Sequence, residues 1–112
     1  MKAVTIELLP KAKSRLRGPV RTRTRRGTVI GFPNAEMLWK AIRPKRWQIL
    51  RAMMGAGPLT IREVSRRVKR DVKLVHADVH VMLDAGIIEH TKTGQVILPF
   101  DAIHIDFTLR AV

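Results

Sequence analysis

The sequence predicts an α+β fold, in which two adjoining helices are followed directly by a β-hairpin and further strands lie near both ends of the chain. Three observations predict it. Apolar residues recur at helical spacing over 59–86. Two short apolar runs of strand type then flank the segment 92–94. Finally, apolar and polar residues alternate over 4–8 and 103–109, which is typical of half-buried strands.

A capping box marks the first of the two adjoining helices. Thr60 and Glu63 have the Thr-x-x-Glu spacing, in which each side chain accepts a hydrogen bond from the backbone N–H of the other residue. The apolar residues that follow recur at helical spacing, so we expect a helix over 61–68. Lys69 and Arg70 would then form the turn to the second helix.

The second helix is expected to begin after Asp71, a good N-cap residue, and to end at Gly86, which readily adopts the left-handed conformation. Its apolar face would carry Val72, Val75, Val79, Met82 and Leu83. Strands are predicted over 87–91 and 95–98, because 92–94 suits a three-residue hairpin loop. A short helix, a turn, a longer helix and a hairpin make a winged helix-turn-helix, whose second helix enters the DNA major groove.

Two further helices are predicted before this pair, making four short helices in all. One runs over 35–42 after the cap residue Asn34, and the other begins at Pro44 and ends near residue 54. Trp39 and Trp47 fall within the apolar stripes of these helices. We therefore expect both tryptophans in the core rather than stacked on nucleic-acid bases.

The chain is expected to form one domain with three parts: an N-terminal strand and basic arm over 1–32, the winged helix-turn-helix over 33–100, and a C-terminal strand over 101–112. Short strands are also expected over 28–30 and at 58–59, the latter pairing with the hairpin. The outer strands have no place in a minimal winged helix, so we expect them to join in a sheet, within one chain or between two. They would make a homodimer through Val4, Ile6, Leu8, Ile103, Ile105, Phe107 and Leu109.

A family resemblance is carried by six short stretches of the second half of the chain. They are 57–63, 69–73, 75–76, 78–79, 83–89 and 98–101. Over about 32–109 the sequence resembles winged helix-turn-helix regulators of the MarR/ArsR type, and within them a family of small DNA-binding proteins that often accompany a toxin-like neighbour. The resemblance implies DNA contacts from the N-terminal part of the second helix, and it implies a toxin protein as a further partner.

The charge of the chain points to a polyanionic partner. The formal net charge is +13 and the sequence pI is about 11.6. Residues 1–32 carry nine Lys or Arg and one acid, residues 33–70 carry ten and two, and residues 71–112 carry three and six. We therefore expect affinity to come mainly from the parts before the second helix. A membrane surface is not expected, because no basic amphipathic helix with bulky aromatic residues is present.

The segment 11–26 carries cations but has little to bury, so we expect a mobile arm. Its cations are Lys11, Lys13, Arg15, Arg17, Arg21, Arg23, Arg25 and Arg26. In the functional interpretation this arm follows phosphates or enters a minor groove. The alternative is a solvated loop that only raises solubility.

Residues of two kinds are expected at the DNA surface. Phosphate contacts would come from Thr60, Arg62, Arg66, Arg67, Lys69, Lys92 and Thr93. The second helix would contact DNA through Arg70, Lys73, Leu74, His76, Ala77 and His80. Leu74 and Ala77 can contact thymine methyl groups but cannot form bidentate hydrogen bonds, which weakens base readout. Leu74 equally suits a contact with protein.

Other functional classes find little support. His76, His80 and Asp84 share one helix stripe, but a further metal ligand is lacking, so we expect no metal and no cofactor. The chain has no cysteine, no Gly-rich phosphate loop and no Gly-x-Ser-x-Gly motif, so we do not expect an enzyme. It has no signal-peptide core and no run able to span a membrane, so a cytoplasmic location is expected.

Three functions fit these observations. The leading hypothesis is sequence-specific binding of double-stranded DNA by a dimeric transcriptional regulator, a repressor that acts on its own promoter. The alternative is an antitoxin that neutralises a protein toxin and regulates itself through DNA binding. A basic RNA-binding protein is the weaker alternative.

Overall fold

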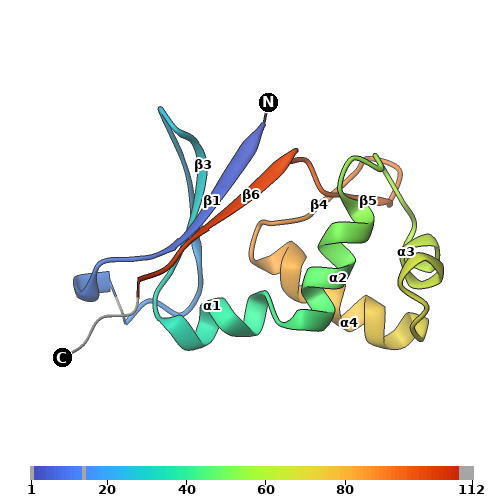
Figure 1. Cartoon of the computed structure of the whole chain (residues 1–112), viewed down its shortest axis with the longest axis horizontal. Coiled ribbons are helices and arrows are strands. Elements are labelled where there is room, and N and C mark those ends of the chain that lie inside the picture. The colour runs from blue at the N-terminus through green and yellow to red at the C-terminus, as the bar shows by residue number, and fades with distance from the viewer. Residues whose placement is uncertain (1, 14, 109–112) are drawn as a thin grey trace.

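The computed structural model describes residues 2–13 and 15–108, and within them it has four helices, a mixed four-stranded sheet and a two-stranded hairpin (Figure 1). The predicted α+β class is confirmed. In chain order the elements are β1 (Ala3–Leu8), a 3₁₀ turn (Lys11–Lys13), β2 (Val20–Thr24), β3 (Gly27–Phe32), α1 (Ala35–Ala41), α2 (Pro44–Met53), α3 (Ile61–Val68), α4 (Val72–Asp84), β4 (Glu89–His90), β5 (Val96–Ile97) and β6 (Ala102–Asp106). None of the described helices is long and apolar enough to cross a membrane.

β1 occupies an inner position in the four-stranded sheet, whose order is β2-β3-β1-β6. It runs parallel to both neighbours, β3 and β6, while β2 pairs antiparallel with β3. Val4 lies opposite Thr28 on one side and opposite Ile103 on the other. The strands expected near the two ends of the chain, β1 and β6, therefore do join in a sheet, and they do so within one chain.

This pairing corrects the dimerisation role expected for Val4 and Ile6. Both side chains are completely buried in the core of their own chain, so they are not available to a second protomer. Three other apolar side chains of these strands pack, half-buried, against the same core: Leu8, Ile103 and Ile105. Phe107 is also half-buried. Leu109 lies outside the described residues.

The structure also corrects the expectation of a mobile arm over 11–26. Its second half forms β2, and Arg25 and Arg26 make the turn from β2 to β3. Val20, Thr22 and Thr24 are β-branched residues at alternate positions, which suits an edge strand once β3 supplies a partner. The many cations of the segment favoured the prediction of disorder over this strand pattern.

One hydrophobic core joins the sheet, at the left of Figure 1, to the helices at the right. Its largest fully buried side chains include Ile6, Ile30, Phe32, Leu38, Ile49, Leu50, Met53, Met82, Ile87, Ile88 and Phe100. The expected parts 1–32, 33–100 and 101–112 all contribute residues to this core or pack against it. They are therefore parts of one packed unit.

The α3–α4 pair begins with the expected capping box. The Glu63 N–H donates to Thr60 Oγ1 and the Thr60 N–H donates to Glu63 Oε1, each at 3.1 Å. Lys69 ends α3 in the left-handed conformation, with φ of 55°. Asp71 then caps α4, because its Oδ1 accepts from the Lys73 N–H at 2.8 Å. These local signals placed both helices correctly.

The β4–β5 hairpin is shorter than the sequence predicted, but its turn is as expected, with Gly94 at a φ of 80°. Leu59 pairs with Val96 through two backbone hydrogen bonds of 2.9 and 2.8 Å. This bridge confirms the expected pairing of the segment before α3 with the hairpin.

The prediction that both tryptophans lie in the core is wrong. Trp39 is 48 % exposed and Trp47 is 36 % exposed. The inner faces of α1 and α2 are already filled by Leu38, Ala41, Arg46, Ile49, Leu50 and Met53. Trp39 instead packs edge-on against Phe107, with ring centroids 5.4 Å apart. Val72, expected on the apolar face of α4, lies in its first turn and is 39 % exposed.

Candidate nucleic-acid interface

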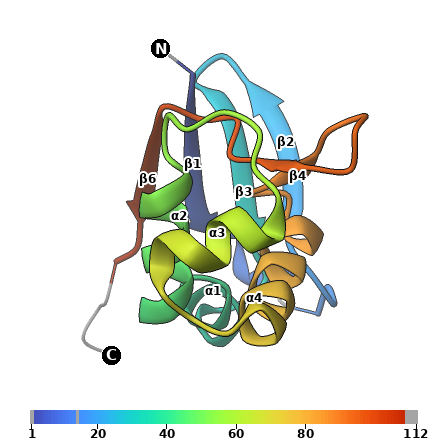
Figure 2. The same cartoon turned by 90° about the vertical axis from the view of Figure 1, so that its right-hand side faces the viewer.

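α3 lies at the front of Figure 2 and carries several exposed cations. The exposed cations of the helix and its C-cap are Arg62, Arg66, Arg67 and Lys69. Glu63, the acid of this helix, is held by the capping box. Hydrogen bonds from the backbone and side chain of Thr60 hold the pKa of Glu63 below its ordinary value. The carboxylate therefore serves the helix start, and the arginines face solvent.

α4 exposes five of the residues predicted to contact DNA. They are Lys73, Leu74, His76, Ala77 and His80. The Nε2 atoms of His76 and His80 lie 3.1 Å apart, within hydrogen-bond distance. Leu74 is 55 % exposed. Helical spacing puts the histidines toward one side of this face and Leu74 with Ala77 toward the other, so α4 combines hydrogen-bonding and apolar groups.

The β4–β5 hairpin lies beside α4. The His90 ring in β4 is 6.4 Å from the His80 ring, centroid to centroid. In the loop, Lys92 and Thr93 are exposed, and the hydroxyls of Thr91 and Thr93 lie 3.0 Å apart. Figure 2 shows this loop projecting from the body of the molecule. Lys92 and Thr93, which are expected to contact the DNA backbone, thus belong to a hairpin that lies beside the exposed face of α4.

Arg70 does not join that face. Its Nη2 atom lies 2.8 Å from Asp78 Oδ2, and its side chain is only 15 % exposed. Asp78 also accepts from Arg46 Nε at 3.0 Å, and Arg46 donates to the carbonyl of Lys40. We call Arg46, Arg70 and Asp78 the Asp78 cluster. It ties α2, α4 and the turn after α3 together, which corrects the expected role of Arg70 as a DNA contact.

Asp78 carries its charge despite being buried. Burial by itself raises the pKa of a carboxylate, but the hydrogen bonds from Arg70 and Arg46 outweigh it and hold the pKa of Asp78 below its ordinary value. Sequence reasoning missed this cluster. The available signal was the position of Asp78 between Val75 and Met82 on the apolar face of α4, where an acid needs a cation.

A groove of about 620 Å³ runs between the start of α2 and the first two turns of α4. Arg43 and Lys45 line it from α2, and Leu74 and Ala77 line it from α4. Both cations are exposed. Sequence reasoning did not assign them to the site, although the basic run around Pro44 was visible. They extend the cationic surface along the apolar side of α4.

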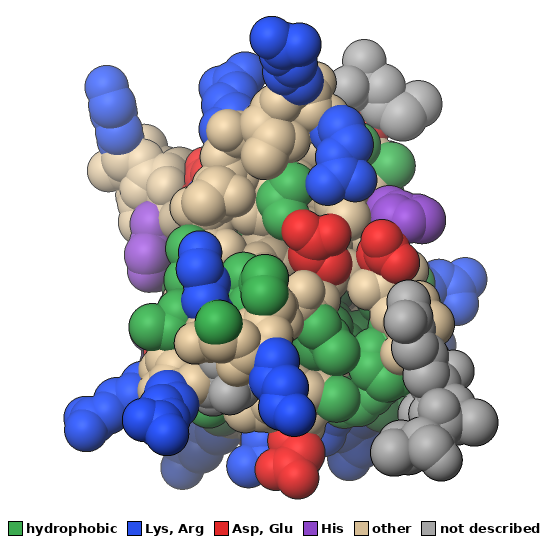
Figure 3. Space-filling view, turned by 90° about the vertical axis from the view of Figure 1, so that its left-hand side faces the viewer, with side chains coloured by type: hydrophobic (Ala, Val, Ile, Leu, Met, Phe, Trp, Pro, Cys, Tyr) green, Lys and Arg blue, Asp and Glu red, His purple; other side chains and the backbone are tan. Residues whose placement is uncertain are grey.

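The cations of the expected arm lie elsewhere. The 3₁₀ turn Lys11–Lys13 is at the far left of Figure 1, away from α3. Figure 3 shows Lys and Arg side chains at the top and along the lower edge of the sheet side. Arg21 forms a 2.9 Å ion pair with Glu89, and its guanidinium lies 5.6 Å from the centre of the Phe100 ring. The structure therefore does not gather the arm cations with those of α3.

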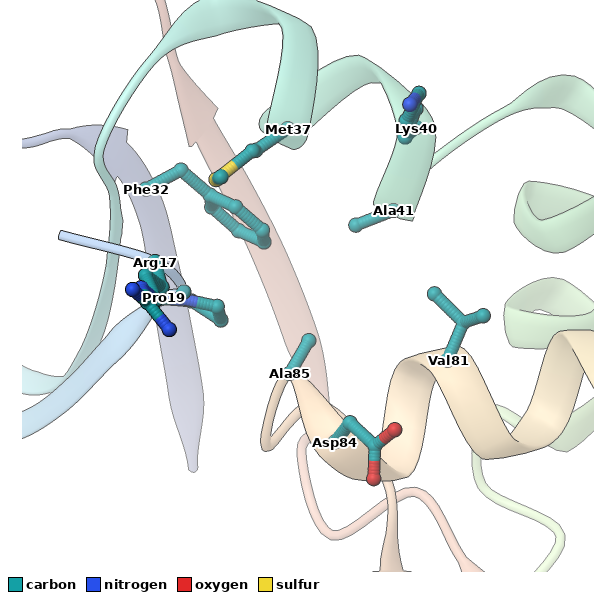
Figure 4. Close-up of a pocket in the computed structure, with 10 residues that line it drawn as sticks. Arg17, Pro19, Phe32, Met37, Lys40, Ala41, Val81, Asp84 and Ala85 are labelled. Atoms are coloured by element: carbon teal, nitrogen blue, oxygen red, sulfur yellow. The ribbon is translucent and has the colours of Figure 1, made fainter. Parts of the chain in front are cut away.

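A hollow of about 450 Å³ opens between α1, the end of α4 and the loop before β2 (Figure 4). Phe32, Met37, Ala41, Val81 and Ala85 form its apolar surface. Its charged lining residues are Arg17, Lys40 and Asp84. The lining has no hydroxyl, thiol or imidazole group.

The three α4 residues considered as metal ligands, His76, His80 and Asp84, do not come together in the structure. His76 and His80 face each other, whereas Asp84 lines the hollow at the end of the helix. Within 2–13 and 15–108, no group of three or more His, Cys, Asp or Glu side chains is arranged to hold a metal ion.

The sequence profile of the HVO_A0114 family matches residues 41–105, which is more than half of the chain and runs from the end of α1 into β6. No curated protein and no solved structure matches the chain.

Proposed function

The chain belongs to the HVO_A0114 family, and we propose that it is a sequence-specific DNA-binding transcriptional regulator that uses α3, α4 and the β4–β5 hairpin as a winged helix-turn-helix. One observation carries the proposal. A cationic helix and an exposed loop carrying Lys92 lie on either side of α4, whose outer face holds Lys73, His76 and His80. This is the arrangement that a duplex requires, with readout in a groove between two phosphate strands.

In this proposal α4 enters the major groove. Its 13 residues span about 20 Å at 1.5 Å per residue. A helix with its side chains is about 10–12 Å across, which suits a major groove about 12 Å wide. Lys73 and His76 would donate to base edges, while Leu74 and Ala77 would contact thymine methyl groups. A recognition helix of this composition forms few hydrogen bonds with bases. Because Leu74 and Ala77 would contact thymine methyl groups, we expect a preference for sites that contain A·T pairs.

Contacts with DNA phosphates would hold α4 in register with the bases. The residues proposed to make these contacts are Thr60, Arg62, Arg66, Arg67, Lys69, Lys92 and Thr93. Repression fits this scheme, because a second copy on an inverted repeat would occupy the next half-site, about one helical turn or 34–36 Å away. The bound pair would then compete with other proteins for the same promoter.

Selection from a pool of random duplexes tests the proposal. The full chain should enrich one motif, arranged as an inverted repeat, and it should prefer that duplex to structured RNA of equal length. Failure to enrich any motif would remove sequence-specific binding. Equal or tighter binding of structured RNA would favour the RNA-binding alternative instead.

A further inference from the structure

The two edges of the four-stranded sheet differ in chemistry. β2, with the sequence VRTRT, carries Arg21 and Arg23, and Arg25 and Arg26 follow in the turn. β6, with the sequence AIHID, has no Lys or Arg. Charged side chains, basic ones above all, are a common means of preventing an edge strand from pairing with another chain. β2 carries basic residues along its length, whereas the charged residue of β6 is Asp106 at its end.

The apolar side chains of β6 are incompletely covered. Ile103 and Ile105 lie in register with Val4 and Ile6, which are completely buried. The two isoleucines remain half-buried because, among the described residues, no strand lies beyond β6. A further strand on this edge would bring apolar neighbours to both of them.

The exposed apolar surface continues past the end of β6. Phe107 follows the strand and packs against Trp39. Trp39 and Trp47 in turn line a shallow hollow of about 550 Å³ together with Ile42, Arg43 and Pro44. Large aromatic side chains gathered beside a pairing edge are typical of protein contacts rather than of a solvated surface.

Charge favours a second copy of the chain as the occupant. The chain carries a formal net charge of +13, so two copies repel each other wherever cations gather. The charged residues within and just before β6 are Asp101 and Asp106, and Glu7 lies opposite Asp106 in β1. Asp101 already accepts a hydrogen bond from the backbone N–H of Lys2 at 2.9 Å. Two copies can therefore approach at β6 without placing cation against cation.

We propose that two copies pair β6 with β6 in antiparallel fashion about a two-fold axis through His104. In this register Ile103 of each copy lies opposite Ile105 of the other, so the half-buried isoleucines form one apolar row. The two sheets become one continuous sheet, with the helices of both copies on the same side. The Trp39–Phe107 pair flanks the shared edge at each end. This proposal rests on the binding of two copies to an inverted repeat proposed above, but its test measures dimerisation in the absence of DNA.

Position 104 allows a sharp test, because His104 is exposed and would lie opposite His104 of the second protomer only in the dimer. The mass of the full chain in solution should be that of a dimer at micromolar concentration. His104→Lys and His104→Glu should each raise the dimer dissociation constant about tenfold, since like charges then face each other. Mixing the two variants should restore the dimer. Thr22→Lys, at the middle of β2, is the matched control and should leave the mass unchanged.

The outcomes separate this proposal from the proposed function. A full chain that is monomeric at tens of micromolar, or a dimer that His104→Lys and His104→Glu leave intact, would overturn the β6 interface. A monomeric chain would make a heterologous protein, such as a toxin, the next occupant of this edge. If His104→Lys dissociates the dimer but still binds a single half-site normally, both proposals stand. A dimer that binds no duplex would remove only the DNA function.

Discussion

The helical end of the molecule, formed by α2, α3, α4 and the β4–β5 hairpin, and its sheet end, formed by β1, β2, β3 and β6, use charge differently. The helical end buries an acid between two arginines and leaves the cations of α3 facing solvent. The sheet end keeps its cations on the surface, where Arg21 of β2 pairs with Glu89 of β4 in an exposed contact between the two ends. The comparison teaches that charge in this chain has two separate uses, one in holding the fold and one in presenting a surface.

The largest expected effect concerns that surface. If the five cations proposed as phosphate contacts bind DNA, duplex affinity should fall about five-hundredfold between 50 and 200 mM salt, because binding releases condensed counterions. Those cations are Arg62, Arg66, Arg67, Lys69 and Lys92. Fluorescence anisotropy over a salt series measures the slope. A nearly flat dependence would contradict the electrostatic basis of the proposed function.

Matched variants then locate the phosphate contacts. Arg66→Ala combined with Arg67→Ala should reduce the salt slope by about two. Lys11→Ala combined with Lys13→Ala, at the sheet end, should change it little, because the 3₁₀ turn lies away from α3. Equal reductions for both pairs would show that the arm binds DNA as strongly as α3 does.

The next effect concerns buried charge. Asp78→Ala should reduce the free energy of unfolding by about 3–5 kcal/mol, since it leaves Arg46 and Arg70 buried without their acid. Glu89→Ala, which removes the exposed pair with Arg21, should cost less than about 1 kcal/mol. Urea unfolding measures both. Similar costs for the two variants would erase the distinction between the ends.

The same cluster predicts a dependence on pH. The pKa of Asp78 in the folded chain lies below its ordinary value of 3.8, so the unfolded chain takes up this proton first. Its stabilisation is therefore complete above about pH 3.8 and is lost as the pH falls through the folded-state pKa. Unfolding of the native chain and of Asp78→Asn between pH 2.5 and 6, in steps of about half a unit, should converge toward the acid end. A constant difference across that range would contradict the ionised Asp78.

Base readout should be a smaller effect than phosphate binding. Lys73→Ala or His76→Ala should each relax preference at one or two base pairs by about 1–3 kcal/mol, because these side chains face the proposed groove. Binding to point-mutated duplexes measures this preference. A uniform loss across all duplexes would place both residues on phosphates, leaving α4 without a reading role.

The smallest effect concerns the helix start. Thr60→Ala should cost about 1 kcal/mol of stability, because it removes the acceptor for the Glu63 N–H. Thr22→Ala is the control at the sheet end, an exposed position on β2. It should cost less in urea unfolding. A greater cost at position 22 would mean that β2 contributes more to stability than its exposure indicates.

Local interactions explain what the sequence by itself determined. The capping box spans four residues, the turn at Lys69 and Arg70 and the Asp71 cap lie between adjoining helices, and the Gly94 turn closes a short hairpin. Each of these needs only neighbouring residues, so composition and spacing predict it. The alternation in 4–8 predicted β1 for the same reason, since strand periodicity is a local property.

Contacts between distant residues decided the rest. Asp78 and Arg46 are 32 positions apart, and Lys2 and Asp101 are 99 apart, so no local pattern identifies either pair. β2 forms because β3 offers an edge to a segment whose charge alone favours disorder. Trp39 stays exposed because Leu38 and Ala41 already fill the inner face of α1. Pairing and burial depend on which surfaces the folded chain brings together, and one-dimensional periodicity does not contain that information.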